Sequence, residues 1–359
     1  MKTILFLSVF AIILSLSVVA IPNAEAGRSF NLAKGTCAHP LGGTWVGSPI
    51  TSKTIGTCTI TGTSTLKVGV TMNIPLGVTL VLTGSGNLSV YGPINIFDGV
   101  IDNSGTITIS NTVGKGINND GTITNSGTIT ISNTAGYGVF NLGSIDNSGT
   151  ITISNSGGSG ISNDGGTINN SSGGIITLSN TGGTGIENIS PFDNSGTITI
   201  SNTGGEGIAN QDTFDNSGTI TISNTAGRGI VNTGTFTNNA GHTITISNTA
   251  TGSEGIFNNG TFDNSGTIII SNSDGTGIDN DTSIPFDNSG IITIINSGGT
   301  GIDNISTITN SGTITISNTG GIAGINNDDT ITDTGTICKS GGGTYTGINP
   351  TSGPVGTCV

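Results

Sequence analysis

Apolar and polar residues alternate with a period of two along most of this chain, and the alternation restarts at regular intervals. The apolar residue that opens each restart lies at Ile101, Ile123, Ile145, Ile168, Phe192, Phe214, Phe236, Phe262, Phe286, Ile308 and Ile331, in steps of 22 to 26 residues. This alternation predicts short β-strands that turn every second side chain inward, and it fits no helix. A near-constant period of strand formers and turn formers predicts a solenoid whose units stack along one axis.

Each repeat contains three alternating runs separated by turn residues. In the first repeat the runs begin at Ile101, Ile107 and Ile117, with glycine-containing segments between them. Glycine, serine, asparagine and aspartate are the residues that tight turns favour. We therefore expect three short strands per coil, each ending in an inward asparagine.

Asparagines recur at the ends of these runs in two long series. One series is Asn111, Asn133, Asn155, Asn180, Asn202, Asn224, Asn248, Asn272, Asn296 and Asn318, and the other is Asn141, Asn163, Asn188, Asn210, Asn232, Asn258, Asn280 and Asn304. A buried amide costs free energy unless it is hydrogen-bonded. At the ~4.8 Å spacing of adjacent strands, each amide can donate to the asparagine one coil away. We interpret both series as structural ladders and not as catalytic groups.

Three strands per coil, about 22 residues per turn, stacked isoleucines and corner asparagines resemble the right-handed parallel β-helix of pectin-lyase-like proteins and filamentous-haemagglutinin-like adhesins. The resemblance covers roughly residues 60 to 337. It implies an all-β fold, a single elongated domain and a right-handed coil. It leaves the function open, because this scaffold carries lyases, hydrolases, adhesins and inert fibres.

The two ends of the chain differ from the repeats. Residues 1–26 are predicted to be a secretory signal, because Met1 and Lys2 precede an apolar run that ends at a small-residue cleavage site, Ala24-Glu25-Ala26. The alternative is an uncleaved anchor, since the run has about the ~17 to 20 residues of a membrane span. The remaining regions are a cysteine module at 27–58, irregular first coils at 59–100, the repeats at 101–337 and a second cysteine module at 338–359.

The four cysteines, Cys37, Cys58, Cys338 and Cys358, all lie in these two modules. An even number of cysteines in an exported chain favours disulfides. Both modules repeat a Gly-Thr-Cys and a Gly-Gly-Thr-aromatic segment, which predicts that Cys37 pairs with Cys58 and Cys338 with Cys358. A loop of this length contributes ~3 kcal/mol in the chain-entropy model. We expect the bonds to fasten the ends of the solenoid, whose unpaired strand edges would otherwise recruit further strands.

The formal net charge of −13 disfavours nucleic acid and anionic membrane surfaces as partners. The phenylalanines that open repeats are expected in the core. Phe140 and Phe257 instead fall at outward positions, where they can contact carbohydrate or a neighbouring protein.

An enzyme on this scaffold would be expected to cleave polysaccharide, which needs a carboxylate pair or a base beside a cation. Acidic residues gather late in the chain, and Arg228 and His242 are the basic residues between Lys115 and Lys339. A lyase would therefore have no base, and we assign no catalytic residue. The outward candidates for a metal are Asp263, Asp279, Asp287 and Asp303, for which calcium is the cation to consider.

The most regular predicted face carries Thr-x-Thr in successive repeats. Its central positions, which we treat as a candidate binding surface, are Thr197, Thr199, Thr219, Thr221, Thr243 and Thr245. Two ranks of threonine ~6.6 Å apart along the strand and ~4.8 Å apart between coils resemble the ice-binding face of β-helical antifreeze proteins. Ile175, Ile269 and Ile291 interrupt the ranks, and threonine is also simply a good strand former on a solvated face.

The sequence as a whole favours a secreted or cell-surface structural or adhesive rod without catalysis, with a cell-envelope component or a carbohydrate as its partner. No membrane span is expected after signal cleavage. The alternatives are ice binding through the Thr-x-Thr face and binding or cleavage of polysaccharide. The oligomeric state is left open.

Overall fold

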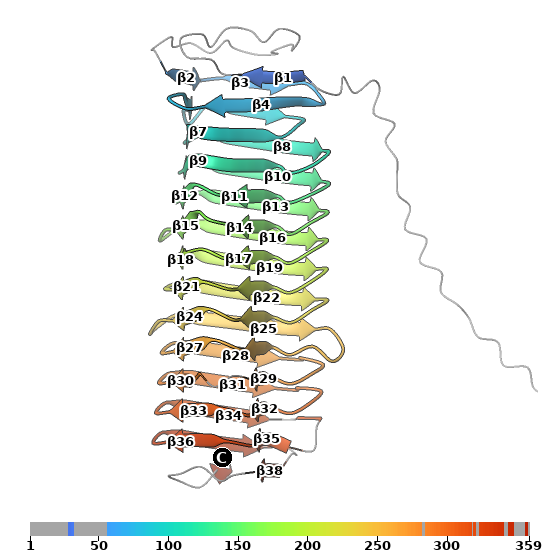
Figure 1. The fold of residues 1–359 in the computed structure, drawn as a ribbon, viewed down its shortest axis with the longest axis vertical. Helices are drawn as coiled ribbons and strands as arrows, with labels where there is room; N and C mark the ends of the chain where they lie inside the picture. The colour runs from blue at the N-terminus through green and yellow to red at the C-terminus, as the bar shows by residue number, and fades with distance from the viewer. Residues whose placement is uncertain are drawn as a thin grey trace, which may run out of the picture.

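The computed structural model describes residues 28–31, 56–281, 284–317, 319–320, 323–340, 344–347 and 356–357. These residues contain strands and turns but no helix, and the strands stack into one straight rod (Figure 1). The expected alternation of inward and outward side chains is confirmed. The predicted signal at 1–26, most of the module at 27–58, and Cys37 and Cys358 lie outside the described residues.

One side of the rod is a 14-stranded parallel sheet, whose outer surface we name the Thr face. Its strands are β3 (Thr63–Leu66), β6 (Asn87–Val90), β8 (Thr106–Thr112), β10 (Thr128–Thr134), β13 (Thr150–Ser156), β16 (Ile175–Thr181), β19 (Thr197–Thr203), β22 (Thr219–Thr225), β25 (Thr243–Thr249), β28 (Thr267–Ser271), β31 (Ile291–Ile295), β34 (Thr313–Ser317), β37 (Thr336–Ser340) and β39 (Gly356–Thr357). Each strand pairs in register with the strand of the next coil, for example β19 with β22.

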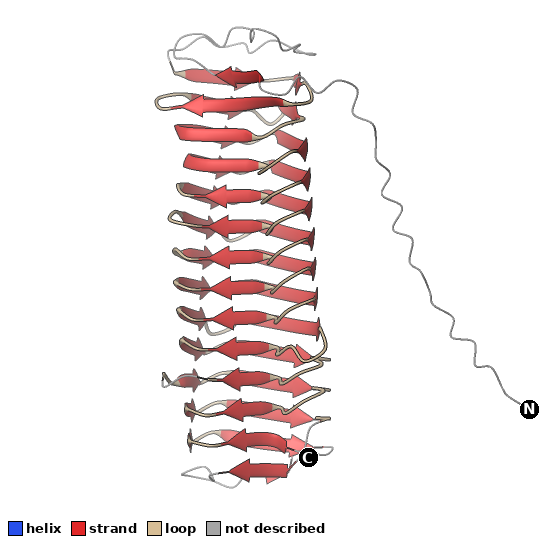
Figure 2. Cartoon of the chain, turned by 45° about the vertical axis from the view of Figure 1, so that its right-hand side comes forward, coloured by secondary structure: helices blue, strands red, loops and turns tan. Residues whose placement is uncertain are grey.

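The other strands belong to a 25-stranded parallel sheet with two outer surfaces. The groove face is formed by β1 (Arg28–Asn31), β4 (Val70–Pro75), β11 (Val139–Asn141), β14 (Ile161–Asn163), β17 (Ile186–Asn188), β20 (Ile208–Asn210), β23 (Ile230–Asn232), β26 (Ile256–Asn258), β29 (Ile278–Asn280), β32 (Ile302–Asn304), β35 (Ala323–Asn327) and β38 (Thr344–Gly347). Figure 2 shows strands of successive coils lying above one another along the rod.

The third surface, which we name the Asp face, has its own series of strands. They are β2 (Thr57–Ile60), β5 (Thr79–Leu82), β12 (Ser144–Asn147), β15 (Thr167–Asn170), β18 (Phe192–Asn194), β21 (Thr213–Asn216), β24 (Thr235–Asn238), β27 (Thr261–Asn264), β30 (Phe286–Asn288), β33 (Thr307–Asn310) and β36 (Thr330–Asp333). Two longer strands, β7 (Ile94–Asn103) and β9 (Ile117–Asn125), run through both the groove face and the Asp face and join them into one sheet.

The core is a set of stacked identical side chains. Five phenylalanines that open repeats, Phe192, Phe214, Phe236, Phe262 and Phe286, are fully buried and stack at centroid distances of 4.6, 4.8, 5.0 and 4.8 Å. The parallel register imposes this face-to-face spacing, which equals the separation of neighbouring strands. The predicted inward position of these rings is confirmed.

Glycines fix the entry into the short strands of the groove face. A side chain at Gly207, just before β20, would place its Cβ 2.4 Å from Cγ2 of Ile222 and 2.5 Å from the carbonyl oxygen of Gly229. Only glycine lets the backbone pass so close to the core. This explains why a Gly-Ile pair opens these strands in successive repeats.

Two ladders of buried asparagines run along the rod. The predicted series from Asn141 to Asn304 is confirmed as inward and is extended by Asn119 and Asn327, with N···O distances of 2.7 to 2.9 Å between successive amides. A second buried ladder runs from Asn103 to Asn310 at 2.6 to 2.8 Å. Its last member among the described residues is Asp333, which accepts a hydrogen bond from Asn310 at 2.7 Å.

The prediction that the series beginning at Asn111 is also inward is wrong. The side chains from Asn111 to Asn296 are exposed, and their backbone φ angles lie between 53° and 56°. This left-handed conformation turns the chain at the corner, so the alternation shifts by one residue and the next side chain faces inward: Thr225 is 3% exposed whereas Asn224 is on the surface. The exposed amides still form a ladder, at 3.1 to 3.3 Å. Asn318 lies outside the described residues.

Candidate functional site

The six threonines proposed as a binding surface lie together on the Thr face. Thr197, Thr219 and Thr243 are in register across β19, β22 and β25, and Thr199, Thr221 and Thr245 form the neighbouring rank. The structure adds a third rank that the sequence reasoning missed, Ser201, Ser223 and Ser247, in the same register. The signal for it was present, because in Thr-x-Thr-x-Ser the serine follows the second threonine by two residues, and its side chain therefore points to the same side of the strand.

This hydroxyl surface is divided into blocks. Ile175 and Ile291 replace threonine in the first rank and are 41% and 47% exposed. Ile269 replaces threonine in the second rank, beside Thr245. Uninterrupted surfaces therefore extend over β8, β10 and β13, and again over β19, β22 and β25. Each block presents a flat array of hydroxyl and methyl groups.

The four aspartates considered for metal binding do not form one site. Asp263 and Asp287 are neighbours in register on the Asp face, whereas Asp279 and Asp303 are neighbours on the groove face. Strand alternation predicts that all four point outward, but it does not predict which face each of them occupies. Within the described part of the chain, no group of three or more histidine, cysteine or acidic side chains has the geometry to hold a metal ion.

Three aspartates on these faces, Asp193, Asp263 and Asp279, have raised pKa values. Partial burial, and then the Asp303 carboxylate, raise the pKa of Asp279 to about 6, with smaller contributions from Glu254 and Asp281 and an opposing one from Arg228. Partial burial and the next carboxylate in register also raise the pKa of Asp263 and of Asp193. Burial, and then the like charge one coil away, therefore disfavour ionisation of these three aspartates.

The groove face carries the most varied side chains. Its central outward column reads Phe140, Ser162, Glu187, Ala209, Val231 and Phe257 in register. The aromatic residues are outward as expected, but each is covered by a cation from the preceding coil. The Lys115 Nζ lies 3.3 Å from the Phe140 ring centroid, and the Arg228 Cζ lies 4.3 Å from that of Phe257. These contacts cover ring surface that a sugar platform would need.

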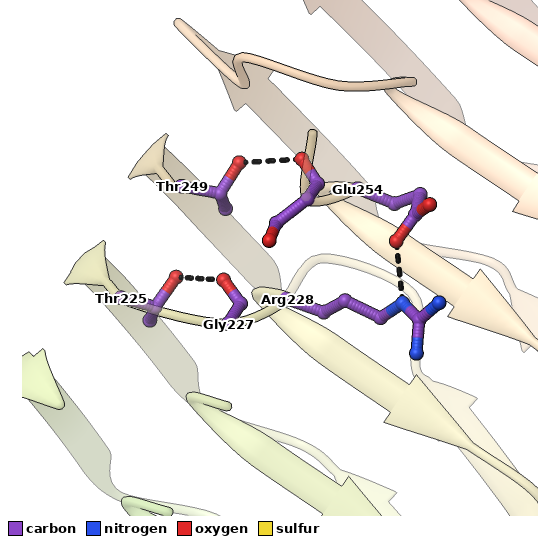
Figure 3. Close-up of polar contacts among 6 residues, drawn as sticks. Thr225, Gly227, Arg228, Thr249 and Glu254 are labelled. Atoms are coloured by element: carbon purple, nitrogen blue, oxygen red, sulfur yellow. Dashed lines mark hydrogen bonds and ion pairs between the residues drawn. The ribbon is translucent and has the colours of Figure 1, made fainter. Parts of the chain in front are cut away.

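Further contacts hold these two cations in place. Arg228 is in the turn before β23, and its Nε donates to the carboxylate of Glu254 in the turn before β26 (Figure 3). Lys115 donates to Oδ1 of Asn118 at 2.9 Å. Burial lowers the pKa of Lys115, and the nearby Asp164 carboxylate opposes this shift. Both cations are therefore engaged with groups of the protein itself.

Between the two covered rings the groove face is hollowed. The depression has a volume of about 480 Å³. Small side chains, Ser162 and Ala209, form part of its lining, together with the carboxylates of Asp164, Glu187 and Glu206. Glu206 accepts a hydrogen bond from the buried Thr184 hydroxyl at 3.0 Å. We name this depression the acidic groove.

A longer, shallower groove follows the corner with the exposed asparagine ladder. It extends from Asn111 to Asn248 with a volume of about 1340 Å³, and its other lining residues are threonine, serine, glycine, alanine and Val113. Its lining carries no titratable side chain, so it offers hydrogen bonds and methyl contacts but no acid–base chemistry.

The cysteine modules are described only in part. Cys58 is buried in β2 and Cys338 lies in β37, and neither is a free thiol. Their predicted partners, Cys37 and Cys358, lie outside the described residues, so the pairing stays a prediction.

Comparison with known proteins gives no match to this chain among protein-family models, curated proteins or solved structures. The described part of the chain contains no helix that could span a membrane. The physical character of the surfaces is therefore the basis for a functional proposal.

Proposed function

We propose that this protein is a secreted or cell-surface rod with a structural or adhesive role and without catalysis. The observation that carries the proposal is the unbroken in-register stack, in which each coil repeats the hydrogen bonds of the last. Two buried amide ladders and a column of stacked rings connect successive coils, so bending the rod would disturb many contacts together. Stiffness and length are the properties that a spacer or a display rod requires.

The arrangement of charged groups supports a role without catalysis. Hydrolysis of a glycoside needs two carboxyl groups that flank one bond, and elimination needs a base near the substrate. The carboxylates here stack as like-charged neighbours, and Lys115 and Arg228 are held against aromatic rings. A cell-envelope component or a neutral carbohydrate is the partner we propose.

The proposal also covers finer features of the coil. We propose a right-handed coil of three strands, with ends fastened by disulfides between Cys37 and Cys58 and between Cys338 and Cys358. The similarity of the two modules supports this arrangement. Closed ends keep a rod of parallel strands from adding further chains at its edges.

The adhesive role is tested by incubating the purified mature protein with a carbohydrate array and with a cell-envelope fraction. Saturable binding without turnover is the expected result. Release of new reducing ends or of unsaturated sugar products would show cleavage and refute the proposal. Absence of binding to both samples would leave a purely structural role and remove the adhesive one.

Ice binding is a second candidate, and the third hydroxyl rank favours it. A surface three residues wide over β19, β22 and β25 is broader than the two ranks that the sequence suggested. A flat and rigid array of methyl and hydroxyl groups can match a planar crystal surface over many contacts. The isoleucine interruptions limit each uninterrupted block to three coils, so we rank this function second.

A further inference from the structure

We propose that the Thr face is an interface between two copies of this chain, which pack face to face as parallel rods about a twofold axis that runs along the rods. The interface does not depend on the adhesive role of the protein. It rests on three features of the Thr face: the absence of charge from its strands, a patch of outward isoleucines, and the self-complementary arrangement of that patch.

The Thr face is the uncharged side of a strongly acidic protein. Its strands from β8 to β34 contain no ionisable side chain, whereas the chain as a whole has a net charge of −13. Carboxylates lie in register on the other two surfaces, at Asp263 and Asp287 on the Asp face and at Asp279 and Asp303 on the groove face. Two copies that met through either of those surfaces would bring like charges together, which disfavours association. Contact through the Thr face avoids this repulsion.

A patch of isoleucines lies on this face, at positions that threonine or serine occupies in most coils. Ile291, Ile269 and Ile295 belong to the first, second and third ranks of two adjacent strands, β28 and β31. Ile291 is 47% exposed, and the other two side chains are partly exposed. Apolar side chains gathered on a flat surface favour contact with a partner, because a partner removes them from water.

The isoleucine patch is complementary to itself under a twofold axis along the rod. Such an axis, placed over the second rank, reverses the strand direction but keeps each coil at the same height. The first rank of one copy then lies against the third rank of the other. Ile291 therefore meets Ile295, and Ile269 meets its own counterpart, as a symmetric contact between identical surfaces requires.

The same operation also pairs the polar groups. Threonines of the first rank lie opposite serines of the third rank, for example Thr219 opposite Ser223, and each hydroxyl can both donate and accept a hydrogen bond. In β16, Ile175 lies opposite the smaller Ser179. A twofold axis across the rods, through the middle of the stretch from β8 to β34, would instead place β31 against β10, whose outward residues are threonine and serine. The parallel arrangement therefore matches the side chains better.

The size of the Thr face suits a stable dimer. The stretch from β8 to β34 is roughly 48 Å long at the spacing of neighbouring strands, and three ranks with their side chains are roughly 20 Å wide. Such a surface offers roughly 900 Å² per copy, close to the ~800 Å² per partner of a standard protein interface. The in-register strands keep the three ranks on one surface, so its whole length is available to the second copy.

Analytical ultracentrifugation of the full mature protein tests this interface. We expect a reversible dimer at micromolar protein. Ile269→Lys should weaken dimerisation at least tenfold, because it sets two ammonium groups against each other on the axis. The matched control is Ile305→Lys, since Ile305 is 51% exposed at the corner between the groove face and the Asp face, and it should change the dimerisation constant less than twofold. Circular dichroism of each variant confirms that the rod is folded.

Cross-linking determines how the two copies are arranged. Sheets that pack face to face are ~10 Å apart, which is too far for a direct disulfide, so a short bismaleimide is used. Ile269→Cys should cross-link to its own counterpart. Ile291→Cys should cross-link only when it is mixed with Ile295→Cys. The parent protein, treated in the same way, is the control for the native cysteines.

Three results would overturn the inference. A parent protein that stays monomeric at every concentration would show that the Thr face does not bind a second copy, and thermal hysteresis of that monomer would assign the face to ice. Equal weakening by Ile269→Lys and Ile305→Lys would show association that does not depend on the Thr face. A dimer in which Ile269→Cys does not cross-link would have its interface on another surface or between antiparallel rods.

Discussion

Asn224 donates a hydrogen bond to Oδ1 of Asn202 at 3.2 Å, although both amides are on the surface of the rod. The neighbouring buried ladder has the same chemistry, because Asn216 donates to Asn238 at 2.8 Å with both side chains fully enclosed. The two pairs differ in burial and in backbone conformation. Their comparison separates the contribution of a buried amide from that of a corner residue.

The first prediction compares these two asparagines. Asn216→Leu removes the acceptor of the Asn194 side-chain N–H and the donor to the Asn238 side-chain oxygen, and each buried unsatisfied group costs ~1 to 3 kcal/mol. Asn224→Leu interrupts only solvated hydrogen bonds, but it places a bulky residue at φ 53°, which costs ~1 to 2 kcal/mol. We expect a larger fall in thermal midpoint for Asn216→Leu, measured by circular dichroism.

Asn224→Gly is the control for the corner. Glycine adopts the left-handed conformation readily, so this variant should keep nearly the thermal midpoint of the parent protein. If Asn224→Gly were as unstable as Asn216→Leu, the exposed ladder itself would be a major source of stability.

The second prediction concerns the pH dependence of stability. The pKa of Asp279 is raised to about 6 in the folded protein, above the ~3.9 of an unfolded chain. The folded state therefore binds this proton more tightly, and ionisation of Asp279 reduces stability as pH rises from about 4 through 6. We expect Asp279→Asn to raise the thermal midpoint at pH 7 and to give no advantage at pH 4.

Asp102→Asn serves as the matched control, since it removes one charge at an exposed position far from Asp303. Thermal midpoints of the parent and both variants are measured from pH 4 to pH 8. A gain for Asp279→Asn that is the same at every pH would contradict the proposed protonation effect.

The third prediction is the disulfide pairing. Non-reducing peptide mapping of the mature protein should find Cys37 joined to Cys58 and Cys338 joined to Cys358, because each pair belongs to one module. A peptide that joins Cys37 to Cys338 or Cys358 would refute the idea of separately fastened ends. Bonds between chains would indicate covalent fibres.

The fourth prediction separates the two functional candidates for the Thr face. If this face binds ice, Thr199→Tyr and Thr221→Tyr should abolish thermal hysteresis and crystal shaping, because a bulky ring lifts the flat surface from the crystal. Asp263→Asn, on the Asp face, should leave both properties intact. Under the leading proposal the parent protein shows no hysteresis, so a clear signal at micromolar protein would place ice binding first.

The sequence predicted the repeat, the strands and the inward stacks because alternation over short strands follows directly from backbone geometry. It failed at the corner that contains Asn224, since the left-handed residue shifts the alternation by one position, which leaves Asn224 exposed and turns Thr225 inward. Asparagine is among the residues most tolerant of this conformation. The Asn-Thr pair before a glycine-containing turn therefore indicated a left-handed corner, which a strict alternation of inward and outward residues does not take into account.

The candidate surfaces show a second limit of sequence reasoning. The alternation along each strand correctly predicted that Asp263 and Asp279 point outward. Only the pairing of strands between coils shows that they lie on different faces. The acidic groove could not be predicted at all. Its hollow depends on Ser162 and Ala209 lying between larger side chains from other coils, and these residues are neighbours only after the chain has wound around the rod.

The buried ladder whose last described member is Asp333 has a consequence for how such a rod can change in evolution. Each asparagine accepts from one coil and donates to the next, so duplication or deletion of a whole coil inside the ladder leaves every amide satisfied. An ionised aspartate accepts but has no N–H to donate, so a coil added beyond Asp333 would lack this hydrogen bond. Gene duplication can therefore adjust the length of the rod from within, while the coil that carries Asp333 is preserved.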